Sequence, residues 1–178
     1  MDEPTQRLFF ALWPDASTSD ALAMLAQQIV IESGGRPTTP GNVHVTLAFL
    51  GDQPPSVVHE LSAAAARISA PAFDLVFDRV DSWRKSAIAW AGVQSVPVPL
   101  VELHQAVSRS LLASGIEPDQ RPFAVHVTLA RRIDTAIRRS LAPPLTWHVT
   151  AFVLVESELS AAGAHYRVLH RWPLVATS

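Results

Sequence analysis

The pentapeptide HVTLA occurs twice in this chain, at 44–48 and again at 126–130. In an extended strand successive side chains point to opposite faces, so the histidine and threonine of each copy share one face. The valine and leucine residues of each copy share the other face and can anchor the strand in a core. Two copies of one strand predict two related halves.

A third HVT, at 148–150, lacks the following leucine and comes after Pro143-Pro144. The two HVTLA copies instead each follow a turn-rich approach, Pro40-Gly41-Asn42 in the first and Arg121-Pro122 in the second. We therefore interpret the third HVT as the start of a long hydrophobic strand and not as part of a site.

Composition limits the class of protein. The chain has 178 residues, 48% of them hydrophobic, which fits one domain, 1–178, or two closely packed lobes. It contains no run of eighteen apolar residues and begins with the acidic Met1-Asp2-Glu3-Pro4, so we expect no membrane span or secretory signal and a cytoplasmic location. The absence of cysteine excludes disulfides, a thiolate nucleophile and cysteine-based metal sites.

Charge is distributed unevenly along the chain. The net charge of −2 argues against a protein that coats long nucleic acid. The segment from the second HVTLA to Arg139 is positively charged. It contains Arg131, Arg132, Arg138 and Arg139 and a single acidic residue, Asp134. This segment predicts a small anionic ligand, and a solvated basic loop is the alternative.

Hydrophobic periodicity predicts both helices and strands. Strands are expected at 7–12, 43–50, 73–80, 87–93, 123–130, 148–156 and 166–172, with a hairpin turn at 83–86. Helices are expected from a cap at Ser17 or Ser19 to Gly34, at 56–69 and at 98–113, with a short helical piece at 135–141. Strand, helix, loop and HVTLA recur in the same order, so we predict an α+β fold with largely antiparallel sheets. The two pseudo-symmetric lobes would carry their helices outside and the two motif strands across a groove.

Two histidines facing each other across a groove can supply a general acid and a general base. His44 and His126 are the candidates, and Thr46 and Thr128 can donate hydrogen bonds to phosphoryl oxygens. Arg131, five residues after His126, can neutralise charge that develops there. The sequence lacks GxxxxGK[ST], GxSxG and HExxH motifs. We therefore predict phosphoryl transfer without a metal or cofactor.

Four stretches, RLFFALWPD, GRPTTPGNVHVTLAFLG, RPFAVHVTLARR and FVLVESEL, resemble the 2H phosphoesterase superfamily. The similarity is to its RNA 2′,3′-cyclic phosphodiesterase family, long called 2′-5′ RNA ligases, and it spans nearly the whole chain. The resemblance implies that His44 is the proton donor to the departing ribose oxygen and His126 the proton acceptor from water. It also implies a phosphate-binding role for Thr46 and Thr128, a ligand contact for Arg131, and an aromatic contact with a base for Phe49.

Ala48 departs from the family pattern, in which Arg or Lys is frequent at this position. The positive charge of that residue is missing here, which puts the expected binding of longer RNA in question. We interpret His59 and His104 as surface or boundary residues of helices, leave His165 and His170 unassigned, and regard Trp83, at a predicted loop tip, as the tryptophan to test for base stacking.

The sequence predicts a monomeric, cytoplasmic enzyme that opens 2′,3′-cyclic phosphate ends of RNA or nucleotides to 2′-phosphomonoesters. One alternative is an enzyme for another cyclic phosphate, such as ADP-ribose 1″,2″-cyclic phosphate, or for ligation of 2′-5′ RNA ends. The other alternative is a protein that binds RNA ends without turnover.

Overall fold

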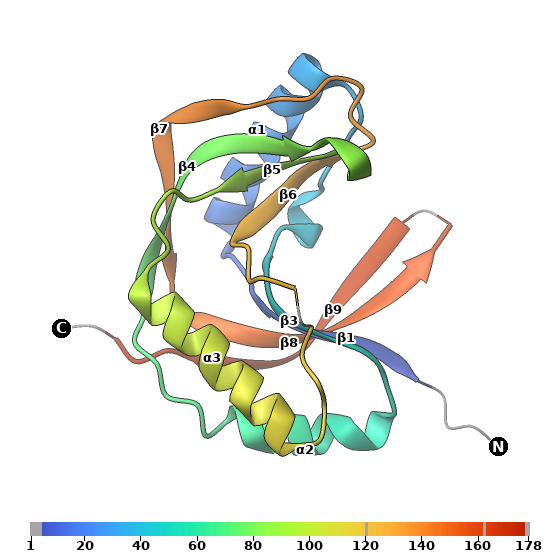
Figure 1. Ribbon diagram of the computed structural model, residues 1–178, viewed down its shortest axis with the longest axis vertical. Helices are drawn as coiled ribbons and strands as arrows, with labels where there is room; N and C mark the ends of the chain where they lie inside the picture. The colour runs from blue at the N-terminus through green and yellow to red at the C-terminus, as the bar shows by residue number, and fades with distance from the viewer. Residues whose placement is uncertain (1–4, 120, 162, 177–178) are drawn as a thin grey trace.

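The computed structural model describes residues 5–119, 121–161 and 163–176, which form an α+β fold (Figure 1). The helices are α1 (Ala16–Ser33), α2 (Pro55–Ala65) and α3 (Val98–Ala113), with 3₁₀ turns η1 (Pro40–Asn42) and η2 (Arg84–Ser86). The strands are β1 (Gln6–Leu12), β2 (Arg36–Pro37), β3 (Val45–Gln53), β4 (Phe73–Trp83), β5 (Ile88–Gly92), β6 (His126–Arg131), β7 (Arg139–Val149), β8 (Ala151–Ser160) and β9 (Gly163–Pro173).

The strands form two sheets. The β3 sheet has the order β3-β1-β8-β9, and the β6 sheet has the order β2-β6-β5-β4-β7. Neighbouring strands pair antiparallel throughout both sheets. Each HVTLA copy therefore lies in a different sheet, and the predicted antiparallel α+β class with two lobes is confirmed.

The helices lie on the outer sides of the two sheets, and α1 and α3 each pack on the sheet of the other lobe. Helix α1 follows β1 of the β3 sheet but contacts β2 and β6, whereas α3 connects β5 to β6 of the β6 sheet but contacts β3. Figure 1 shows α2 and α3 together beneath the β3 sheet, and α1 behind the β6 sheet. The lobes are thus joined by exchanged helices, and the repeat in the sequence does not divide the molecule into an N-terminal and a C-terminal lobe.

Strand β1 is buried on both faces. Leu8, Phe10 and Leu12 belong to the main core, while Phe9 and Ala11 face the other way into a smaller apolar cluster with Val153 and Val155. This explains the continuous apolar run RLFFAL, because a strand covered on both faces needs no polar alternation. Burial of each such large side chain contributes about 1.5–3 kcal/mol.

Several predicted boundaries were wrong. Helix α1 is capped by Asp15 and not by Ser17 or Ser19, because the Asp15 carboxylate accepts a hydrogen bond of 2.7 Å from the Thr18 amide. Helix α2 ends at Ala65 rather than at 69, and the turn-rich approach to the first motif contains the short strand β2 and the turn η1, which the sequence did not predict. Gly34 ends α1 as predicted, with a positive φ of 74°.

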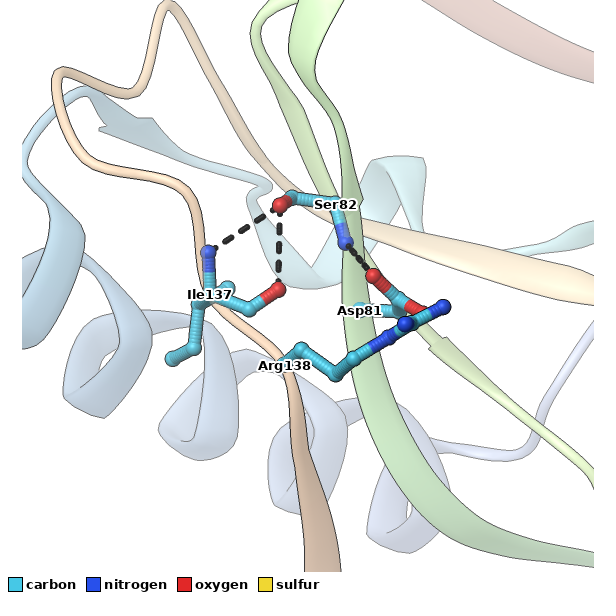
Figure 2. A network of polar contacts seen from close by, with 4 residues as sticks. All are labelled: Asp81, Ser82, Ile137 and Arg138. Carbon is cyan, nitrogen blue, oxygen red and sulfur yellow. Dashed lines mark hydrogen bonds and ion pairs between the residues drawn. The ribbon is translucent and has the colours of Figure 1, made fainter.

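The predicted helical piece at 135–141 does not form. Figure 2 shows that this segment is tied to β4 by Ser82, whose hydroxyl donates to the Ile137 carbonyl and accepts from the Ile137 amide, both at 3.0 Å. An ion pair of 2.9 Å between Arg138 and Asp81 adds to this network. The chain then enters β7, an edge strand that accommodates Pro143 and Pro144 because one side of an edge needs no N–H donors.

The strand expected at 148–156 is two strands in different sheets. Strand β7 ends at Val149 and β8 begins at Ala151, so the chain changes sheets at Thr150. The third HVT thus straddles the end of a strand. His148 is exposed and its Nδ1 lies 2.7 Å from an Asp74 carboxylate oxygen.

Candidate active site

The two motif strands show the expected alternation. Val45, Leu47, Val127 and Leu129 are buried in the main core, and the histidine and threonine side chains of both copies are partly exposed on the opposite face. His44 immediately precedes β3 and lies two residues after the end of η1, and His126 is the first residue of β6. Each imidazole therefore stands where its chain enters a strand.

The two copies meet at one groove. A cavity of about 340 Å³ is bordered by residues from both sheets. All six residues singled out in the sequence line it, namely His44, Thr46, Phe49, His126, Thr128 and Arg131.

Both imidazoles are oriented in the same way by the main chain. The Nδ1 of His44 lies 2.8 Å from the Asn42 carbonyl oxygen, and the Nδ1 of His126 lies 2.7 Å from the Ala124 carbonyl oxygen. A carbonyl can only accept, so each Nδ1 carries the hydrogen and each neutral ring has its lone pair on Nε2. Within the described residues no hydrogen bond reaches either Nε2. The site therefore offers two matching nitrogen atoms for proton transfer.

Burial makes both imidazoles weaker bases. Desolvation lowers the pKa of His44 to about 4, opposed by the Asn42 hydrogen bond and assisted by the charges of His126 and Arg131. Desolvation also lowers the pKa of His126, opposed by the Ala124 hydrogen bond and assisted by Arg131. Both rings are neutral at pH 7 in the free protein.

Three aromatic rings enclose His44. Trp13 stacks on the imidazole at 5.6 Å between centroids and 11° between planes, and the rings of Phe9 and Tyr166 lie at 5.1 Å. Tyr166 comes from β9. The side-chain amide of Asn42 donates a 3.0 Å hydrogen bond to the carbonyl oxygen of Ala164 on the same strand. Sequence reasoning missed this enclosure because Phe9, Trp13 and Tyr166 meet only through the pairing of β1, β8 and β9.

His126 has a more open aromatic neighbourhood. Trp83, at the end of β4, meets it edge-on at 4.6 Å, and Trp90 lies at 6.4 Å. Trp83 is 38% exposed and borders the groove, which places the tryptophan singled out in the sequence beside the second histidine. The indole N–H of Trp90 is buried without a hydrogen-bond partner among the described residues.

A larger cavity of about 510 Å³ continues the groove and shares Thr46, Phe49, His126, Thr128 and Arg131 with the first. Phe49 is 42% exposed in it, with the Arg121 guanidinium 5.9 Å from the ring centroid. Ala48 also lines this cavity, and its methyl group is buried. The cavity has the size and the exposed aromatic surface for a nucleobase.

His104 also borders this larger cavity, which the sequence interpretation of a surface or boundary residue did not anticipate. Its ring stacks on Phe123 at 3.9 Å and 5° between planes, and its Nδ1 donates to the Leu47 carbonyl at 2.9 Å. The helix α3 residue thereby supports the first motif strand. In the sequence, the only indication of this contact was that His104 lies beside the apolar stripe of its helix.

The described part of the chain contains no cluster of three histidine, aspartate or glutamate side chains that could hold a metal ion. Among the same residues, no helix has the length and apolar character needed to cross a membrane.

Known proteins resemble this chain in sequence and structure. The sequence profile of the 2′-5′ RNA ligase superfamily matches residues 14–161. The Escherichia coli (strain K12) protein named RNA 2′,3′-cyclic phosphodiesterase is 34% identical over 98% of this chain and 99% of its own length. The crystal structure of E. coli LigT in apo form superposes with a TM-score of 0.83 at 32% identity, over 97% of this chain and 99% of the other. LigT complexed with 3′-AMP also gives 0.83 at 32% identity, over 96% and 98%.

Proposed function

Since this chain belongs to the 2′-5′ RNA ligase superfamily, we propose that it hydrolyses 2′,3′-cyclic phosphate ends of RNA or nucleotides to 2′-phosphomonoesters. One observation carries the proposal: two imidazoles from different sheets border one groove, each with Nδ1 fixed by the main chain and Nε2 available. The name of the E. coli relative, RNA 2′,3′-cyclic phosphodiesterase, supports the same activity.

The proposed reaction is an in-line displacement at phosphorus by water. His126 accepts a proton from the water as its oxygen forms a bond to phosphorus, and His44 donates a proton to O3′ as the P–O3′ bond breaks. The product is a 2′-phosphate with a free 3′-hydroxyl. His126 is left protonated and His44 neutral, and exchange with solvent resets both before the next turnover.

The remaining polar groups of the groove stabilise the charge on the phosphoryl group. Thr46 and Thr128 lie two residues along each strand from the histidines, and their hydroxyls donate to the non-bridging oxygens in this proposal. Arg131 borders both cavities and meets the negative charge, which is present in the substrate and grows in the transition state. A hydrogen bond in which donor and acceptor are both charged is stronger than one from a neutral hydroxyl to the same anion, so Arg131 contributes most.

The donor role of His44 requires that its imidazole take up a proton from solvent when the substrate binds. At pH 7 the free protein holds His44 neutral because its pKa lies at about 4. A bound cyclic phosphate places a negative charge beside the imidazole, and an opposite charge nearby raises the pKa of a histidine. His44 thus becomes protonated when the anion binds, and it stays neutral while the groove is empty.

The direction of ring opening depends on the residues that differ between the two halves. Phe49 and Arg131 occupy equivalent positions after the two HVTLA copies. Phe49 lines the larger cavity, so we place the base against it on the side of the first motif. This orientation directs O3′ of the ribose toward His44 and gives the 2′-phosphate.

The test is incubation of the purified chain with 2′,3′-cyclic AMP, followed by phosphorus NMR of the products. A predominant 2′-phosphate is expected. A predominant 3′-phosphate would mean that the substrate binds in the opposite sense and that His44 and His126 exchange roles. Binding of RNA ends without turnover would identify a binding protein instead, and turnover only of ADP-ribose 1″,2″-cyclic phosphate or ligation of 2′-5′ ends would identify the other enzyme classes.

The proposal extends to the whole chain, 1–178, as one bilobal unit that works as a cytoplasmic monomer without a cofactor. A continuous buried core that includes residues from both sheets supports the single unit. Sedimentation analysis tests the monomer. Because both proton-transfer groups are imidazoles, activity should persist after exhaustive EDTA treatment, and loss of activity with loss of a stoichiometric ion would contradict the mechanism.

A further inference from the structure

Four cationic side chains gather beside the groove at one end of the strands of the β6 sheet. We call Arg36, Arg84, Lys85 and Arg132 the basic rim; all four are exposed. They come from three separate segments, namely β2, the η2 turn between β4 and β5, and the chain just after β6.

Strand pairing places these segments side by side. Arg36 of β2 and Ile88 of β5 are both partners of Arg131 on β6, one on each side. After β6, the Ile133 amide donates to the Ala87 carbonyl at 3.2 Å, and Ile133 shares a surface hollow with Arg84. In Figure 1 the β4–β5 turn lies next to the chain that leaves β6.

The rim continues the wall of the groove. Trp83, Ile88 and Arg131 line the larger cavity, and each is next to a rim segment in sequence or in strand pairing. Trp83, 38% exposed, directly precedes Arg84. An exposed aromatic ring followed by cations is the combination that proteins use to bind single-stranded nucleic acid, through base stacking and backbone phosphates.

The rim side chains have no carboxylate partner, in contrast to four other arginines of the described residues. Arg138 and Arg139 are paired with Asp81 and Glu32, each at 2.9 Å, and Arg121 and Arg167 are also in ion pairs. Within the described residues none of the four rim side chains is in an ion pair. Asp134 borders the same hollow as Arg84 without forming one. The rim charges are therefore available to an external anion.

We propose that the basic rim holds the phosphodiester backbone of an RNA strand on the 5′ side of the cyclic phosphate. The inference rests on the proposed function and adds to it the residues that hold an RNA strand beyond its terminal nucleotide. Every nucleotide beyond the terminal one lies on the 5′ side, so a strand whose terminal base occupies the larger cavity leaves past Trp83 toward η2. The rim also supplies positive charge that the neutral Ala48 does not.

The experiment compares two double variants of equal net charge. R84Q/K85Q removes two rim charges, and R138Q/R139Q removes two neighbouring charges that are already paired. KM and kcat are measured for 2′,3′-cyclic AMP and for an octaribonucleotide with a 2′,3′-cyclic phosphate end, over a series of salt concentrations. Arg36→Gln, on a separate strand, serves as a second rim variant if the double variant fails to fold.

For the wild type we expect a lower KM for the octamer than for the mononucleotide. R84Q/K85Q should raise the octamer KM roughly tenfold at low salt and reduce the slope of log affinity against log salt by about 1.4, as expected for two lost contacts to a single strand. The kinetics with 2′,3′-cyclic AMP should not change, and R138Q/R139Q should leave the octamer KM near the wild-type value. Equal KM values for both substrates in the wild type would contradict the proposed role of the basic rim. An equal increase of the octamer KM in the two double variants would contradict it as well.

Fluorescence anisotropy with a labelled octamer ending in a 2′-phosphate separates this inference from the proposed function. Absence of turnover with every cyclic phosphate would refute the function alone, and the affinities of the same variants for the octamer would still decide the rim. Turnover without any effect of R84Q/K85Q on octamer affinity would refute the rim alone.

Discussion

His44 and His126 begin the same pentapeptide, have the same main-chain hydrogen bond at Nδ1, and yet stand in different surroundings. His44 is enclosed by the rings of Phe9, Trp13 and Tyr166, whereas His126 meets the half-exposed Trp83 edge-on. The pKa of both is lowered by desolvation, that of His44 to about 4. The repeated sequence thus fixes the orientation of each imidazole, and the unrepeated residues around it set its basicity.

This difference bears on the proposed roles. A base must be neutral before the reaction, and His126 meets that condition in the free protein at pH 7. An acid must be protonated, and His44 meets that condition only when an anion occupies the groove. The enclosure of His44 therefore makes its protonation depend on bound substrate, which links acid catalysis to binding of the phosphate.

The largest expected effect is the loss of either imidazole. His44→Ala and His126→Ala should each lower kcat by at least about a hundredfold, because loss of a general acid or base usually does so. His148→Ala is the matched control, since His148 has the same HVT context but lies exposed outside the groove. Steady-state kinetics with 2′,3′-cyclic AMP, with circular dichroism to verify folding, provide the measurement. A folded His126→Ala protein with near-normal turnover would contradict the site.

The next effect concerns the charge that both histidines share. Arg131 lowers the pKa of both imidazoles and borders both cavities. Arg131→Ala should raise KM and lower kcat for cyclic phosphates, with kcat/KM reduced on the order of tenfold to a hundredfold. Arg138→Ala, which removes a charge already paired with Asp81, is the control. Unchanged kinetics would show that Arg131 does not meet the phosphate.

Much of the fold was accessible from the sequence because local signals agreed with the tertiary structure. The helix at 98–113 and the hairpin at 83–86 were predicted within a residue or so, since periodicity and turn residues are local properties. The segment at 135–141 was not, because its conformation depends on Ser82 and Asp81, more than fifty residues away in sequence. The exchange of α1 and α3 between lobes likewise has no local signature.

The site divides along the same line. His44, Thr46, His126 and Thr128 followed from two copies of one motif and the alternation of a strand, Arg131 from the positive segment after the second copy, and Phe49 from the family resemblance. The enclosure of His44 did not, because Phe9 looked like an ordinary core residue and Tyr166 lies far along the chain, in β9. The contact of His104 with the groove was not visible for a similar reason, since its partner Phe123 belongs to the approach to the second motif.

Anion binding should change the two histidines unequally. In proton NMR titrations the imidazole of His44 should titrate near pH 4 in the free protein, and saturating phosphate should move its pKa toward 6.5, the value of an unperturbed histidine. The pKa of His126, which is also lowered in the free protein, should rise as well. His148→Ala, which leaves the groove intact, simplifies the spectrum. A pKa of His44 that ignores phosphate would show that the anion does not bind beside it.

The smallest expected effect is on stability. The unfolded chain takes up a proton at His44 near pH 6.5, whereas the folded protein does so only near pH 4. Between these values the unfolded state binds more protons, so the free energy of unfolding falls as the pH falls and is recovered as the pH rises through 6.5. The Tm of His44→Gln should therefore vary with pH less steeply than that of the wild type in this window, by up to roughly 10 °C over its full width.

The groups that face His44 allow this effect to be isolated. His126 has a pKa lowered in the same direction, so His126→Gln should also flatten the pH dependence, and the double variant should flatten it further. Asp81 has a pKa lowered below 3.8, so its contribution to stability is lost only at lower pH. Thermal melts of the four proteins from pH 4 to pH 7 make the comparison, and a His44→Gln curve parallel to the wild type would mean that the aromatic enclosure does not hold the imidazole neutral.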